Sequence, residues 1–175
     1  RELFGYARGE LRHPWLAHLP APFITMLIGR SCPFRCNFCQ PAERNVFGGK
    51  ARIRSTESVM AELRHLRERY DFKSMMIHDD LFIIDRRRVL EFCKAYRENG
   101  FDQPFVCQVR ADIICKNEDL VATLAGAGLS CMMIGFESGN QRILNNIRKG
   151  TTVERAHAFI AEARQARLPV HGCFM

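Results

Sequence analysis

Three cysteines lie close together in one short segment and provide the strongest chemical signal in the chain. The segment from Ser31 to Gln40 spaces Cys32, Cys36 and Cys39 as C-x3-C-x2-C. Three thiolates can converge on one centre, and soft sulfur ligands favour an iron–sulfur cluster, zinc or copper(I). A structural zinc site normally has a fourth ligand from a second Cys or His pair, and no such pair follows downstream. The spacing therefore predicts a metal centre with an open coordination position.

The other five cysteines stand singly in apolar helix or strand contexts, and we interpret them as core residues. Eight cysteines would also suit a secreted disulfide scaffold, but the strongly periodic core makes cross-links unnecessary. We therefore expect a reducing, cytoplasmic compartment. The five predicted core cysteines are Cys93, Cys107, Cys115, Cys131 and Cys173.

The elements that would position this centre are short apolar runs alternating with amphipathic helices. Val59, Leu63 and Leu66 recur at helical spacing, and the predicted N-caps are Thr56, Asp85, Asn117 and Thr152. Such alternation predicts an α/β fold of parallel, right-handed βαβ units, in which either an open doubly wound sheet or a barrel fits the pattern. The predicted strands are 23–28, 73–78, 105–109, 131–136 and 170–175, and the predicted helices are 56–70, 86–99, 118–127 and 141–167.

Polar residues occupy the carboxyl ends of these predicted strands. His78 and Asp80 alternate with the apolar residues of their strand, as Arg110 does in the next, and Glu137 ends the fourth. Active sites of parallel α/β folds are built at this end, so these four residues predict a polar ring. Structural alternatives stay open: Asp79 and Asp80 as loop caps, Arg110 paired with Asp112, and His78 as a core histidine.

The loop after the first predicted strand resembles the signature of the radical S-adenosylmethionine (SAM) superfamily, C-x3-C-x-aromatic-C, with Phe38 as the aromatic residue. The resemblance implies that Cys32, Cys36 and Cys39 bind three irons of a 4Fe-4S cluster and that SAM chelates the fourth. An electron from the cluster would then cleave SAM to methionine and a 5′-deoxyadenosyl radical. It also implies a partial parallel (β/α) barrel, here stopping at about the fifth strand.

The likeness covers residues 22–175, with 1–21 as an approach segment, and is nearest to the subgroup that carries an upstream cobalamin-binding domain. The segments around His78-Asp79-Asp80-Leu81-Phe82, Gly135-Phe136-Glu137-Ser138-Gly139 and Lys149-Gly150-Thr151-Thr152 carry it. By this resemblance Asp79 and Asp80 would accept hydrogen bonds from the amino group of SAM. Glu137 and Ser138 would contact other polar groups of SAM, and Arg110 would face its carboxylate.

The resemblance implies an enzyme that acts on an unidentified small molecule by cobalamin-dependent methylation or ring-forming oxidation. Cobalamin would be held by a domain outside this chain, and flavodoxin or ferredoxin would donate the electron. The alternatives are an RNA or protein methylthiotransferase and a non-catalytic zinc-stabilised binding module.

Neither a nucleic-acid partner nor a membrane-spanning segment is expected. The charge of +7 is spread over helical segments with acids between, as on solvated helix faces, so we expect no nucleic-acid partner. No apolar run approaches the roughly 20 residues that span a bilayer.

Overall fold

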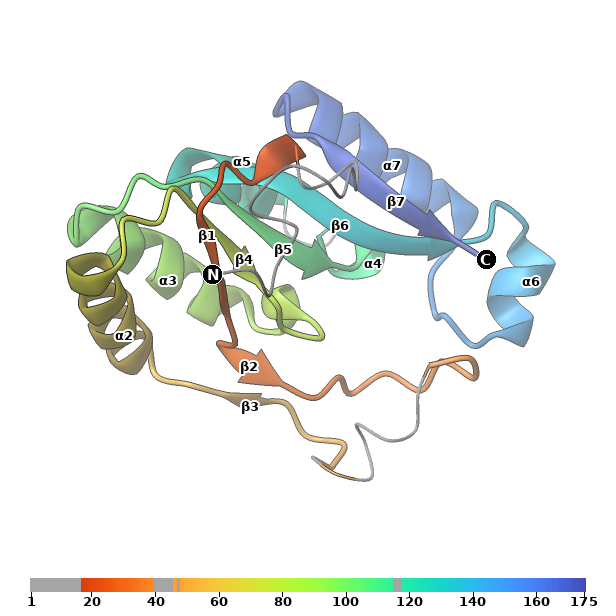
Figure 1. Ribbon diagram of the computed structural model, residues 1–175. Helices are drawn as coiled ribbons and strands as arrows, with labels where there is room; N and C mark the ends of the chain where they lie inside the picture. Colours follow the sequence, from red (N-terminus) through yellow and green to blue (C-terminus); the bar gives the residue numbers. More distant parts are fainter. Residues whose placement is uncertain (1–16, 40–45, 47, 115–117) are drawn as a thin grey trace.

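Five parallel strands form the central sheet of the protein (Figure 1). The computed structural model describes residues 17–39, 46, 48–114 and 118–175. The sheet consists of β1 (Phe23–Met26), β4 (Ser74–Ile77), β5 (Phe105–Val109), β6 (Leu129–Glu137) and β7 (Val170–Phe174). Neighbouring strands follow one another along the chain, in the order β1-β4-β5-β6-β7.

This strand order decides between the two predicted architectures. A doubly wound sheet reverses its order at a switch point and has helices on both faces. Here the order never reverses, and each main helix packs against the next: α2 (Thr56–Arg69) on α3 (Arg86–Glu98), α3 on α5 (Glu118–Ala127), and α5 on α7 (Val153–Gln165). The sheet is therefore wound in one direction, as in a barrel.

Side-chain hydrogen bonds fix where the helices begin. Asp85 and Thr152 cap α3 and α7, as predicted. The predicted cap at Thr56 is wrong, because Ser55 has the extended conformation of an N-cap and its hydroxyl accepts from Ser58 N at 3.2 Å. Thr56 is the first helical residue instead, and the predicted cap at Asn117 lies outside the described residues.

Several short elements were not predicted from the sequence. A two-stranded antiparallel ribbon pairs β2 (Gly29–Arg30) with β3 (Arg52–Ile53), and two short helical segments follow β4 and β5: η3 (Phe82–Ile84) and α4 (Ala111–Ile114). The predicted helix 141–167 is two helices, α6 (Gln141–Asn146) and α7. Between α6 and α7, Arg148 and Gly150 each have a positive φ angle, which breaks the helical path.

Alternate side chains of each strand face opposite layers. Met75 and Ile77 join the main core beneath the helices, whereas Met76 packs with Val106 on the other face. That second face, which we call the inner face, is filled at the amino ends of the strands by Leu19. The end of the predicted approach segment thus packs against the sheet, which leaves the inner face accessible at the carboxyl ends.

Burial tests the core assignment of the single cysteines. Cys93, Cys107 and Cys131 are buried as predicted, and burial raises the pKa of the Cys93 thiol to about 12. The prediction for Cys173 is wrong, because β7 has a neighbouring strand on only one side in the described chain and Cys173 is exposed. Cys115 lies outside the described residues. Within the described parts, no helix has the length and apolar character that crossing a bilayer requires.

Candidate active site

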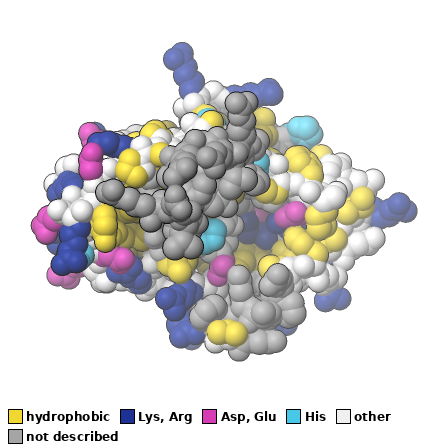
Figure 2. All heavy atoms as spheres, in the orientation of Figure 1, with side chains coloured by type: hydrophobic (Ala, Val, Ile, Leu, Met, Phe, Trp, Pro, Cys, Tyr) yellow, Lys and Arg dark blue, Asp and Glu magenta, His cyan; other side chains and the backbone are white. Residues whose placement is uncertain are grey.

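An open cleft of about 820 Å³ lies over the carboxyl ends of the strands. In Figure 2, acidic, basic and histidine side chains gather around a hollow near the middle of the view. The cleft brings together all four members of the predicted polar ring and all three clustered cysteines, although Cys32 and Glu137 are 105 positions apart in the sequence. Its predicted residues are Cys32, Cys36, Phe38, Cys39, His78, Asp80, Arg110 and Glu137.

The cysteine loop leaves the ribbon at Ser31 and is fixed at its start and between its second and third cysteines. At its start, Ser31 has φ 74° and its amide donates to Asp80 Oδ2 at 2.7 Å. Between the second and third cysteines, the Asn37 amide donates to Ile147 O at 2.9 Å and its side chain to Asn146 O at 3.0 Å. Two strand ends and the end of α6 therefore hold the three thiols over one cleft.

The thiols fit the iron–sulfur cluster that the family resemblance implies. All three are free and at least partly accessible, and soft thiolates suit such a cluster. In the described part of the chain, no three His, Cys, Asp or Glu side chains are already gathered as a metal site. Burial raises the pKa of Cys32, and the nearby Arg110 charge opposes that rise. Cluster binding must therefore displace a proton from this thiol.

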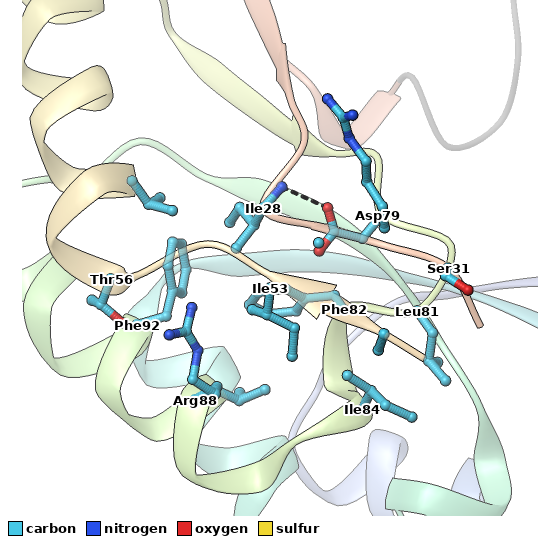
Figure 3. Close-up of a pocket in the computed structure, with 15 residues that line it drawn as sticks. Ile28, Ser31, Ile53, Thr56, Asp79, Leu81, Phe82, Ile84, Arg88 and Phe92 are labelled. Atoms are coloured by element: carbon cyan, nitrogen blue, oxygen red, sulfur yellow. Dashed lines mark hydrogen bonds between the residues drawn. The ribbon is translucent and has the colours of Figure 1, made fainter. Parts of the chain in front are cut away.

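The two adjacent aspartates face opposite sides of the sheet. Asp80 lines the cleft, and its Oδ2 atom supports the cysteine loop. Asp79 is buried, and its Oδ1 atom accepts from Ile28 N at 2.7 Å (Figure 3). It lines a separate cavity of about 20 Å³ between the ribbon, α2 and α3. The predicted contact of Asp79 with SAM is therefore not supported, because alternation along the strand directs neighbouring side chains to opposite faces.

Ser138 and Phe38 also differ in their placement. The Ser138 hydroxyl accepts from Asn140 N at 3.1 Å in the turn after β6, and Ser138 is not among the residues that line the cleft. The predicted contact of Ser138 with SAM is thus not supported. Phe38 does line the cleft, with its ring centroid 5.6 Å from Lys149 Nζ.

Glu137 forms a buried ion pair that the sequence did not indicate. Its Oε1 atom accepts from Lys149 Nζ at 2.6 Å, and the side chains of both residues are 10% exposed. Gly135 makes the room for this pair, because a Cβ atom there would lie 2.2 Å from Glu137 Oε1. Lys149 stands in one of the segments that carry the family resemblance, which is the signal that could have drawn attention to it.

Arg110 is held by several neighbours at the floor of the cleft. Its guanidinium makes two hydrogen bonds to Asp112, at 3.0 and 3.2 Å, which is the alternative pairing that the sequence left open. It also donates to Lys149 O at 2.5 Å and contacts Cys36 Sγ at 3.7 Å. Of its five N–H groups, one is then left without a partner among the described residues.

The fold and this cleft define a parallel α/β enzyme core whose reactive centre is built on thiols at the strand ends. The model of the radical SAM superfamily matches residues 26–175, and the chain belongs to that superfamily. The family binds a 4Fe-4S cluster and SAM, and the observed sheet corresponds to its partial barrel.

Known proteins with similar sequences include methyltransferases and cyclases. The chain is 31% identical over 147 residues to the cytidylyl-2-hydroxyethylphosphonate methyltransferase of Streptomyces wedmorensis, covering 83% of this chain and 27% of that protein. It is 29% identical over 126 residues to the anaerobic magnesium-protoporphyrin IX monomethyl ester cyclase of Rubrivivax gelatinosus, covering 72% and 22%. The chain thus spans about a quarter of the length of these relatives.

A solved structure has the same fold. The cobalamin-dependent SAM radical enzyme OxsB, with aqua-cobalamin and SAM bound, superposes with a TM-score of 0.78 at 21% identity. The match covers 86% of this chain and 23% of OxsB.

Proposed function

We propose that Cys32, Cys36 and Cys39 ligate the 4Fe-4S cluster and that SAM binds beside it in the cleft. The observation that carries this proposal is that three free thiols and two strand-end carboxylates line one opening. When bound, the cluster would supply the electron that cleaves SAM to methionine and a 5′-deoxyadenosyl radical. The protein would orient SAM and limit its contact with water.

The charges of the cleft suit the two ends of the methionine part of SAM. Asp80 and Glu137 would accept hydrogen bonds from the ammonium group, since each has a second carboxylate oxygen besides the one that accepts from Ser31 N or Lys149 Nζ. The remaining N–H of Arg110 and the ammonium group of Lys149 would attract the carboxylate. Phe38, which lines the cleft beside Cys36 and Cys39, would cover its cluster side.

For the whole protein we propose methylation of a small molecule with cobalamin, held on a domain outside this chain. The sequence relative from Streptomyces wedmorensis is a methyltransferase, and OxsB is cobalamin-dependent. Ring-forming oxidation is the second candidate, which the cyclase of Rubrivivax gelatinosus favours. Flavodoxin or ferredoxin would donate the electron, and a reducing cytoplasm would keep the cysteines as free thiols.

The ligand assignment is tested with Cys36→Ala in the full-length protein. After anaerobic reconstitution, we expect this variant to lose most of its iron and sulfide and to form no 5′-deoxyadenosine from SAM and dithionite, because one of three ligands is gone. Cys93→Ala is the matched control: it removes a buried thiol within α3 and should keep full iron content.

Two results would contradict the proposal. Full cluster content with 5′-deoxyadenosine formation in Cys36→Ala would exclude Cys36 as a ligand. Stoichiometric zinc without sulfide in the unmodified protein would favour the zinc-stabilised binding module. A separate assay with added cobalamin distinguishes the two reaction classes, because methylation gives a methylated product and ring-forming oxidation a cyclised one.

A further inference from the structure

A buried positive charge contacts the sulfur of one proposed cluster ligand. Arg110 Nη1 lies 3.7 Å from Cys36 Sγ, a distance that suits a hydrogen bond to the large sulfur atom. Arg110 is only 7% exposed, so little water screens this charge. The contact joins residues that are 74 positions apart, and the fold alone creates it.

The neighbours of Arg110 fix the direction of this contact. Asp112 binds the Nε and Nη2 side of the guanidinium, and Lys149 O accepts from Nη2. The Phe34 ring lies against its flat face, with the ring centroid 3.6 Å from Cζ. Because the guanidinium is planar and held on two edges and one face, Nη1 is directed at the sulfur.

The order of the charges gives this arrangement an electrostatic consequence. The guanidinium stands between Cys36 and the Asp112 carboxylate, which is 6% exposed. Reduction adds an electron to a cluster, and a nearby positive charge or a hydrogen bond to its sulfur favours the reduced form. Asp112 opposes this effect from farther away.

We propose that Arg110, oriented by Asp112, sets the reduction potential of the cluster through its contact with Cys36. This role is distinct from binding the SAM carboxylate, and it rests on the proposed ligand role of Cys36. Arg110 raises the potential, so that a weaker reductant suffices, while Asp112 limits the rise. The two residues of the pair therefore shift the potential in opposite directions.

The experiment is a redox titration of the full-length, anaerobically reconstituted protein without SAM. Dithionite sets the potential, and electron paramagnetic resonance measures the fraction of reduced cluster. We expect a more negative midpoint potential in Arg110→Gln and a less negative one in Asp112→Asn. Arg64→Gln is the matched control with the same loss of charge, because exposed Arg64 hydrogen-bonds Asn99 at the far end of α3, and its midpoint should not move.

Iron and sulfide are counted first, so that loss of the cluster is distinguished from a shift of its potential. A fully loaded Arg110→Gln protein with the midpoint of Arg64→Gln would overturn the proposal. A midpoint shift of Asp112→Asn in the same direction as that of Arg110→Gln would also overturn it. Breaking a purely structural ion pair would disturb the cysteine loop in the same way whichever partner is replaced. If Arg110→Gln holds no cluster, Asp112→Asn decides: a less negative midpoint supports the proposal, and any other result overturns it.

Discussion

At the scale of single residues, alternation along a strand separates two neighbouring carboxylates. Asp80 faces the cleft, whereas Asp79 lies behind the sheet, where it accepts from Ile28 N. Gly29 allows this close approach, because a Cβ atom there would lie 3.1 Å from Asp79 Oδ2. Asp79 is thus a structural carboxylate that joins the end of β4 to the chain after β1.

The raised pKa of the buried Asp79 carboxyl predicts a distinct pH dependence of the free energy of unfolding. Burial is the main cause that raises its pKa above the usual 3.8. The folded state therefore binds the proton more tightly than the unfolded state, and stability falls as the pH rises from about 4 through the raised pKa. Urea unfolding from pH 4 to 7 should show this loss in the unmodified protein and a smaller one in Asp79→Asn, whose side-chain oxygen can still accept from Ile28. Identical pH profiles would show that the carboxylate carries no such effect.

At the scale of elements, side-chain caps determine where α2 begins. The Ser55 hydroxyl accepts from Ser58 N, whereas the hydroxyl of the adjacent Thr56 is buried without a partner in the described structure. The two residues look equally suitable as caps in the sequence. Only the backbone conformation, extended at Ser55 and helical from Thr56, distinguishes them.

Substitutions at these two positions should therefore differ. We expect Ser55→Ala to lower the free energy of unfolding by about 1 kcal/mol, the usual cost of a lost N-cap. Thr56→Val keeps the shape of the side chain and removes an unpaired buried hydroxyl, so it should be neutral or stabilising. Urea denaturation of both variants measures the difference, and a larger loss in Thr56→Val would place the cap at Thr56 after all.

At the scale of the whole molecule, the inner face of the sheet has an apolar end and a polar end. Leu19 packs on Met76, Val106 and Cys131 at the amino ends of the strands. The hydroxyl of Ser74 holds the same segment by donating to Pro20 O at 2.7 Å. The polar cleft lies at the opposite ends, so access to the inner face is directed to the side that bears the cysteines.

Leu19→Ala should be strongly destabilising. Leu19 is 4% exposed, and truncation of a buried leucine costs about 2–5 kcal/mol through lost burial and the cavity left behind. Leu27→Ala is the control, because Leu27 is 43% exposed and its truncation should cost about 0.5 kcal/mol or less. Chemical denaturation compares the free energies of unfolding of the two variants. Equal losses would show that Leu19 does not pack tightly against the sheet.

The sequence by itself determined the main elements and the chemical type of the site. Short apolar runs located every strand of the five-stranded sheet, and the spacing of Cys32, Cys36 and Cys39 indicated a metal centre with an open coordination position. Strand alternation placed His78, Asp80 and Arg110 on one side. These features depend on residues close together in the chain, where spacing translates directly into geometry.

Only the tertiary structure decided which residues meet across the fold. The winding of the sheet, the Glu137–Lys149 pair and the contact between Arg110 and Cys36 join segments with no periodic relation in sequence. Long-range packing sets these outcomes, and the cysteine loop becomes part of an active site only through it.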